Sequence, residues 1–158
     1  MSTYYPLAEG NTWTYKMKDG KAFINTVTAA DGDSFTMIGS MVPRPQNIRR
    51  EGNDFLADNF EPKNFQVFLS DDLKEGDEWD IKDTTSESET VLEMTVKETG
   101  MSIEVEGKTY EDVIKIEGEM KMVMQGAVVS ADYRVQYYYA RDVGLILTTS
   151  SYGDSMAL

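Results

Sequence analysis

The chain has 158 residues, of which 41% are hydrophobic and 27% charged, as in an ordinary globular domain rather than a disordered chain. Its formal net charge of −13 disfavours nucleic acid and anionic membrane surfaces as partners, because both are negatively charged. The chain contains no Cys and no His, which excludes a disulfide framework and Ser-His-Asp or Cys-His catalysis. The length fits one domain over residues 1–158.

No stretch of the chain is apolar over the roughly 18 residues that a membrane-spanning helix needs. The N-terminal residues Met1–Pro6 have neither the basic start nor the apolar segment of a signal peptide. Either the protein is cytosolic or a leader has been removed from it, and the residues leave both possibilities open.

Alternation of apolar and polar residues, the pattern of a half-buried strand, begins near the N-terminus. Trp13, Tyr15 and Met17 alternate with polar residues, and Asp19-Gly20 after them predicts a hairpin turn. A second hairpin is predicted at Asp31-Gly32. The first part of the chain is therefore predicted to be a run of short antiparallel strands.

The middle of the chain is less regular. Pro43 and Pro45 mark a loop or a sheet edge. After Pro62, Phe and Leu residues at helical spacing predict one short helix, although a strand over residues 64–69 fits equally well. The polar residues 83–90 predict a loop or an exposed strand.

Longer strands follow. Leu92, Met94 and Val96 share one face of a predicted strand, and Gly100 is predicted to turn the chain into the next one. The longest predicted strand covers residues 112–125, with Gly118 in its middle, where a strand can bend.

The chain then reverses at a predicted turn, Gln125-Gly126, into an alternating strand that ends near Tyr139. Leu145-Ile146-Leu147 predicts a last, more buried strand. Short turns between consecutive strands indicate an antiparallel meander, and long strands with a central glycine suit a strongly curved sheet. The predicted fold is all-β: a single highly curved antiparallel sheet closing into a partial (open) barrel, with at most one short helix.

The pattern L-x-E-G-x-x-W occurs twice, in Leu7–Trp13 and in Leu73–Trp79. In each copy a glycine turn leads a Trp into the start of a predicted strand. Two interpretations stay open: the chemistry of a turn before a core residue arose twice, or two halves of the sheet begin alike.

Four segments also match a known pattern in the right order. Tyr4–Tyr15 resembles Y-x-P-L-x-x-G-x-x-W-x-Y, Leu73–Trp79 resembles an internal G-x-x-W, Tyr110–Ile116 resembles an aromatic residue leading into a strand, and Tyr138–Ile146 resembles Y-Y-A-x-G-V-G-L-V. Together they resemble the TapB-like family of uncharacterised bacterial extracytoplasmic domains. Asp142 stands where that family has its first terminal Gly, a departure expected to affect only that turn.

The resemblance implies a curved antiparallel sheet or open barrel similar to that of periplasmic lipoprotein-carrier proteins. It also implies export in bacteria, to the periplasm, the cell surface or the medium, with the leader removed. A cytoplasmic location stays open. The chain lacks the cysteine that would carry a lipid anchor. The resemblance implies no established activity and supplies no catalytic residues.

Motifs for catalysis or for cofactor binding are absent from the sequence. Asp31-Gly32-Asp33 and Asp71-Asp72 offer oxygen ligands, but neither matches an EF-hand loop, and turn chemistry explains both. Neither the phosphate-binding loop nor the dinucleotide fingerprint occurs. We therefore predict no enzyme activity, no metal and no cofactor.

The candidate binding surface is the apolar face of the long strands, where flexible Met and amphipathic Tyr side chains gather. In an open barrel this face either lines a cavity for a lipid or another apolar molecule, or is packed core. The predicted binding residues are Met120, Met122, Met124, Tyr133, Tyr137, Tyr139, Trp13 and Trp79.

The predicted function is that of a non-enzymatic extracytoplasmic domain that binds an apolar small molecule. One alternative is a protein-interaction or structural module that uses exposed aromatics such as Tyr138, or a strand edge. Another is a hydrolase that uses two of the chain's 28 acidic residues. The residues do not predict an oligomeric state.

Overall fold

The computed structural model describes residues 3–58, 63–83, 89–124 and 126–158. These ranges contain strands and no helix, and therefore no helix that could span a membrane. The strands are β1 (Thr12–Met17), β2 (Ala22–Asp31), β3 (Ser34–Gly39), β4 (Gln46–Glu51), β5 (Asp54–Ala57), β6 (Gln66–Ser70), β7 (Glu78–Asp83), β8 (Glu89–Val105), β9 (Lys108–Met124), β10 (Ala127–Ala140), β11 (Gly144–Ser150) and β12 (Ser155–Ala157).

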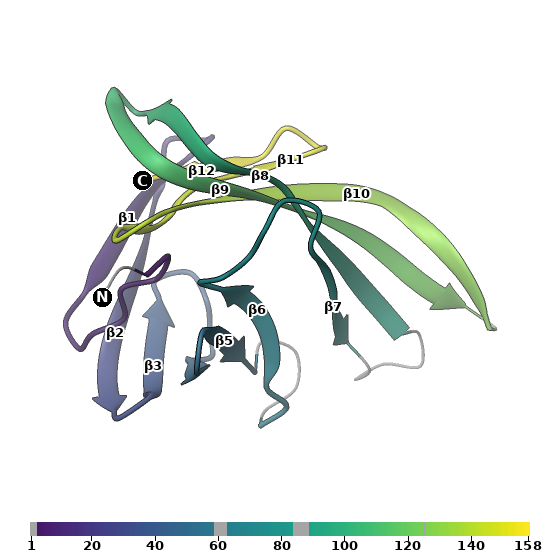
Figure 1. Cartoon of the computed structure of the whole chain (residues 1–158), viewed down its shortest axis with the longest axis horizontal. Helices are drawn as coiled ribbons and strands as arrows, with labels where there is room; N and C mark the ends of the chain where they lie inside the picture. Colours follow the sequence, from purple (N-terminus) through teal and green to yellow (C-terminus); the bar gives the residue numbers. More distant parts are fainter. Residues whose placement is uncertain (1–2, 59–62, 84–88, 125) are drawn as a thin grey trace.

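All these strands belong to one antiparallel sheet, in the order β6-β5-β4-β3-β2-β1-β12-β11-β10-β9-β8-β7. Two meanders, β1–β6 and β7–β11, are joined through β12, which pairs with β1 and with β11. The sheet curls until its two edge strands, β6 and β7, face each other (Figure 1). The result is a barrel with one unsealed seam, which confirms the predicted fold.

The seam is bridged by a side chain instead of a strand ladder. The Gln66 Nε2 donates to the Lys82 carbonyl oxygen at 2.7 Å, and the Gln66 Oε1 accepts from the Lys82 N–H at 2.8 Å. A side-chain amide carries the same donor and acceptor as a peptide group, so it can replace a neighbouring strand at one residue. We refer to this pair of hydrogen bonds as the Gln66 latch.

The predicted hairpins are present where Gly follows Asp. Asp19-Gly20 connects β1 to β2 and Asp31-Gly32 connects β2 to β3, with positive φ at both glycines, where other residues are strained. Gln125 lies outside the described residues, but Met124 pairs with Ala127, so the third reversal is also at its predicted place. The loop predicted at Pro43 and Pro45 separates β3 from β4.

Three sequence predictions need correction or a choice. The short helix after Pro62 is wrong, because those residues form β6 and the strand alternative holds. Gly100 does not end a strand: β8 continues past it, with a positive φ of 64° at Gly100 and register shifts nearby. The segment at Leu145 forms β11 as predicted, but β12 follows it. Residues 84–88 of the predicted polar loop lie outside the described residues.

The two L-x-E-G-x-x-W segments have the same local structure. Gly10 and Gly76 have φ values of 93° and 92°, and each donates its N–H to a buried valine carbonyl, Val27 at 2.8 Å and Val96 at 2.9 Å. The N–H groups of Val27 and Val96 in turn donate to the backbone carbonyls of Asn11 and Asp77, both at 2.9 Å. The two halves of the sheet therefore begin alike, as one of the two interpretations proposed.

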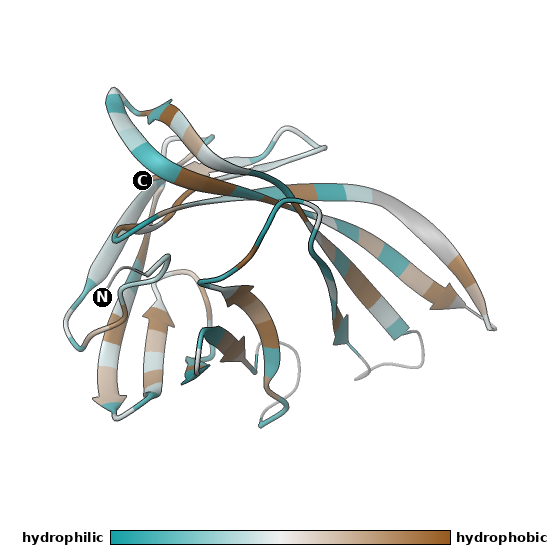
Figure 2. Cartoon of the chain, viewed as in Figure 1, coloured by the Kyte–Doolittle hydropathy of each residue, from teal (hydrophilic) through white to brown (hydrophobic). Residues whose placement is uncertain are grey.

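Alternating hydrophobic and hydrophilic bands run along the long strands (Figure 2). The inner face carries the larger core, which includes Trp13, Tyr15, Phe55, Ile114 and Ile116. The curved β8–β9 hairpin also covers part of the outer face. There a second core forms from Val105, Tyr110, Val113, Ala140, Ile146 and Ala157.

Candidate functional site

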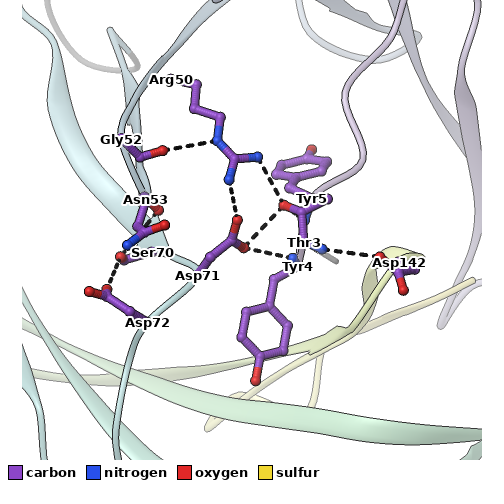
Figure 3. A network of polar contacts seen from close by, with 10 residues as sticks. All are labelled: Thr3, Tyr4, Tyr5, Arg50, Gly52, Asn53, Ser70, Asp71, Asp72 and Asp142. Atoms are coloured by element: carbon purple, nitrogen blue, oxygen red, sulfur yellow. Dashed lines mark hydrogen bonds and ion pairs between the residues drawn. The ribbon is translucent and has the colours of Figure 1, made fainter. Parts of the chain in front are cut away.

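An N-terminal strap, residues Thr3–Leu7, is tied to the end of β6 by a polar network (Figure 3). Asp71 accepts hydrogen bonds from the Tyr4 N–H at 2.8 Å and from the Thr3 Oγ1 at 3.1 Å, and its other oxygen pairs with Arg50 at 2.5 Å. The Asp71 side chain is only 7% exposed, so the aspartate is engaged on all sides. It holds the strap and does not offer itself to a ligand.

The opposite side of the strap is tied to the turn between β10 and β11. The Thr3 N–H donates to the Asp142 Oδ1 at 3.0 Å, and the Asp142 N–H donates to the Thr3 carbonyl at 2.6 Å. The Arg141 guanidinium lies over the Tyr4 ring, 4.0 Å from its centroid. The expectation that Asp142 affects only its own turn is therefore wrong, because its side chain anchors a segment distant in sequence.

The strap places Tyr5 at the centre of an aromatic cluster inside the barrel. The Tyr5 ring meets Trp13 edge-on at a centroid distance of 5.3 Å, and it lies 6.0–6.2 Å from Phe55, Phe68 and Tyr139. Edge-to-face and tilted pairs at such distances stabilise each other beyond the area they bury. The cluster connects both halves of the sheet.

Beside this cluster lies a cavity of about 210 Å³. Its walls come from the strap and from strands of both meanders, and it reaches the inner side of the seam through Phe68 on β6 and Ile81 on β7. Its lining residues are Tyr5, Asn25, Gln46, Phe68, Ile81, Leu92, Met94, Tyr137, Tyr139 and Leu145.

One wall of the cavity depends on a glycine. A Cβ at Gly118 would stand 3.0 Å from the Leu92 Cδ1 and the Met94 Sδ, closer than packed carbons tolerate. The glycine foreseen as a bend in the long strand thus makes room for two side chains that line the cavity.

The lining carries no charged side chain, and its tyrosines stay neutral. Burial raises the pKa of Tyr137 to about 12 and raises the pKa values of Tyr5 and Tyr139 still further. At neutral pH these side chains therefore present hydroxyl groups that donate hydrogen bonds.

Of the predicted binding residues, Tyr137 and Tyr139 line the cavity. Met120 pairs in register with Leu92 on one side and Tyr133 on the other, so it extends the same wall toward the free end of β9 and β10. Met122 follows Met120 on that face and is half-buried. The Met124 side chain lies outside those that the structure describes. Whether this outer part of the wall binds a ligand stays a prediction.

The two predicted tryptophans differ from each other. Trp13 is 5% exposed, and its Nε1 donates to the Val143 carbonyl at 2.7 Å. Trp79 packs against the inner core, and its Nε1 is buried without a hydrogen-bond partner in the described part of the chain. Neither lines the cavity; both support the core around it.

Sequence reasoning missed Tyr5, Phe68 and Leu92 as lining residues. Tyr5 precedes the first strand, and Phe68 belongs to the segment with two equal interpretations, so neither showed a sheet face. The alternation of Leu92 and Met94 predicted one face of a strand, but it did not predict that these side chains line the same cavity as Tyr137. Among residues 3–58, 63–83, 89–124 and 126–158, no group of three potential metal ligands gathers.

No protein-family model and no curated protein sequence matches this chain, so the TapB-like resemblance stays a prediction. Two solved structures share the fold. One is a "putative lipoprotein" from Parabacteroides distasonis, with a TM-score of 0.62 and 13% identity, covering 99% of this chain and 96% of that one. The other is a "putative exported protein" with a YmcC-like fold from Bacteroides fragilis, with a TM-score of 0.57 and 12% identity, covering 100% and 98%.

Proposed function

We propose that this protein is a non-catalytic, extracytoplasmic bacterial domain that binds an apolar small molecule inside its partial barrel. The cavity of about 210 Å³ beside the aromatic cluster carries the proposal. Ligand sites are typically concave and mostly apolar, with a few polar groups that converge on the ligand. Here the lining combines apolar residues such as Ile81, Leu92 and Met94 with a few polar ones, namely Tyr5, Tyr137, Tyr139, Asn25 and Gln46.

Two further observations support this proposal. The names of the two structural neighbours refer to a lipoprotein and an exported protein, which favours a location outside the cytoplasm. A carboxylate-based hydrolase needs two acids in one cleft, and neither Asp nor Glu lines this cavity.

Methyl NMR on the intact protein tests the proposal, with toluene as the probe. Met94 lines the cavity, whereas Met41 is 52% exposed at the surface and serves as the internal control. We expect saturable shifts of the Met94 methyl signal and none for Met41. Shifts of equal size at both methionines, or no saturation, would contradict binding inside the barrel.

A pair of variants on β8 separates the cavity from the surface. Leu92→Phe adds volume on the inner wall, and Val91→Phe places the same ring on the opposite face of the strand, next to Lys82 and Lys121. We expect Leu92→Phe to weaken toluene binding at least tenfold and Val91→Phe to leave it unchanged. Native mass spectrometry of protein from its own host, followed by organic extraction, then identifies the natural ligand.

A second candidate function, protein interaction, is favoured by an exposed apolar group on the outside of β2 and β3. Ile24 and Ile38 are 40% and 44% exposed and lie on the same face, because Ile38 pairs with Thr26. Met41 and Val42 extend this group into the following loop with 52% and 48% exposure. If this group binds a partner, an Ile24→Lys, Ile38→Lys double variant loses the complex and keeps toluene binding.

A further inference from the structure

The polar groups of the cavity narrow the class of ligand it accepts, an inference that rests on the proposed function. Tyr139 is 6% exposed, yet its hydroxyl has no hydrogen-bond partner among the residues that the structure describes. Two other buried tyrosines of the inner core have their hydroxyls engaged by the protein: the Tyr5 hydroxyl donates to the Met37 Sδ at 3.6 Å, and the Tyr15 hydroxyl donates to the Leu145 carbonyl at 2.8 Å. The buried side-chain atoms without a partner in the described part of the chain are the Arg49 Nε and the Trp79 Nε1, so the Tyr139 hydroxyl is not sealed in the core. Since Tyr139 lines the cavity, its hydroxyl is available to donate a hydrogen bond to a ligand there.

Tyr137 adds a second hydroxyl on the same wall. Tyr137 and Tyr139 are two residues apart on β10, and successive side chains of a strand alternate between its faces, so both point to the cavity. Within the described residues the Tyr137 hydroxyl has no hydrogen-bond partner either. The two tyrosines therefore offer two hydroxyl donors from the same strand of the cavity wall.

The lining also excludes charged ligands. Burying a carboxylate or an ammonium group without an opposite charge is strongly unfavourable, and none of the lining side chains is charged. Asn25 and Gln46 are the other polar residues of the lining, and both are neutral amides.

The volume limits the size of the ligand. An apolar cavity of about 150 Å³ in another protein accommodates benzene. The cavity here, about 210 Å³, is large enough for one ring with a small substituent and too small for the chains of a whole lipid.

We propose that the cavity selects a compact, uncharged molecule with a single ring or short branched chain and one hydrogen-bond acceptor, such as a ketone or ether oxygen, held by the hydroxyls of Tyr139 and Tyr137. Tyr139 is the main donor because it is the more deeply buried of the two. Free fatty acids and other anions are excluded from this cavity.

Three probes of similar size test the inference on the intact protein: cyclohexanone, methylcyclohexane and cyclohexanecarboxylate. Each is titrated into the wild type and Tyr139→Phe, with the Met94 methyl signal as the readout. We expect Tyr139→Phe to weaken cyclohexanone binding about tenfold, the loss of one buried hydrogen bond, and to leave methylcyclohexane binding unchanged. Cyclohexanecarboxylate should bind the wild type at least a hundredfold more weakly than cyclohexanone.

Two further variants keep the test decisive. Tyr137 is half-buried, so Tyr137→Phe should weaken cyclohexanone binding about threefold. This variant replaces Tyr139→Phe in the test if Tyr139→Phe does not fold. Tyr138→Phe is the matched control, because Tyr138 packs against the outer core on the other face of β10.

The outcomes separate this inference from the proposed function. If Tyr139→Phe weakens the ketone and the hydrocarbon equally, or if the carboxylate binds as tightly as the ketone, the ligand class is wrong while binding in the cavity stands. If none of the three probes binds the wild type, both proposals are overturned.

Discussion

The two L-x-E-G-x-x-W segments share a backbone but not an environment. Trp13 enters β1, in the interior of the sheet, and its indole N–H reaches the Val143 carbonyl from the other half. Trp79 enters β7, an edge strand at the seam, and its buried N–H has no partner within the described residues. The same local sequence thus produces the same turn. Whether the indole N–H finds a hydrogen-bond acceptor depends instead on the neighbouring parts of the fold.

The largest expected effect is the loss of stability at alkaline pH, where the buried tyrosines that connect the two halves ionise on unfolding. Tyr5 and Tyr15 of the first half and Tyr137 and Tyr139 of the second all have raised pKa values because of burial. The unfolded chain releases these protons near pH 10 and the folded chain does not, so the free energy of unfolding falls as pH rises from about 10 to about 12.

For Tyr137 alone, the shift from 10.0 to about 12 corresponds to about 3 kcal/mol of stability lost across that window. Urea unfolding followed over this pH range measures the loss. Tyr137→Phe should flatten part of the slope. A free energy of unfolding that stays constant up to pH 12 would contradict the burial of these hydroxyls.

A matched pair of substitutions tests whether the two tryptophans contribute differently to stability. Trp13→Phe leaves the Val143 carbonyl without its donor and a void in the core, at a cost of about 2–3 kcal/mol. Trp79→Phe removes an N–H that has no partner in the described residues, which offsets part of the lost packing, so we expect less than about 1 kcal/mol. Equal losses in chemical denaturation would show that the environments do not differ.

The strap is the next test, because it ties both halves together at Thr3. Asp71→Ala removes the acceptor of the Tyr4 N–H and leaves Arg50 without its ion-pair partner, at a cost of about 2 kcal/mol. Hydrogen exchange at the Tyr4 and Tyr5 amides should accelerate as the strap detaches. Asp72→Ala is the control, since Asp72 is exposed and touches no strap residue in Figure 3; accelerated exchange in both variants would contradict the assigned role.

The smallest expected effect is at the seam. Gln66→Ala removes both hydrogen bonds of the Gln66 latch and should lower stability by about 1 kcal/mol, with a local rise in hydrogen exchange at the Lys82 amide. Lys82→Ala keeps the backbone groups that the latch uses, so it should leave exchange at residue 82 unchanged. If hydrogen exchange at the Lys82 amide stayed slow in Gln66→Ala, another group would close the seam.

The sequence predicted what depends on neighbouring residues. Period-two alternation located the strands around Trp13, Leu92 and Ile114, and Asp-Gly pairs located the hairpins, because both signals arise within a few residues. The curved all-β architecture followed from the length of those strands and their order.

What the sequence did not predict depends on distant parts of the chain. The turn expected at Gly100 failed because a positive φ also fits a bulge, and only pairing with β9 decides between them. Tyr5 carries no strand pattern, and its place in the cavity wall follows from anchors at Asp71 and Asp142 that are far away in sequence. The cavity is a product of how faces meet, which alternation within one strand does not specify.

The short strand β12 has a consequence for the order of events during folding. Lys16 pairs with Ala157 and Met17 with Met156, so the joint between the two meanders links residues separated by almost the whole chain. Contacts of such sequence separation require the closure of a very long loop and form late. The first meander can assemble as it is synthesised, but the cavity waits for Ser155–Ala157. A chain carried across a membrane before this joint closes would complete its cavity only at its destination.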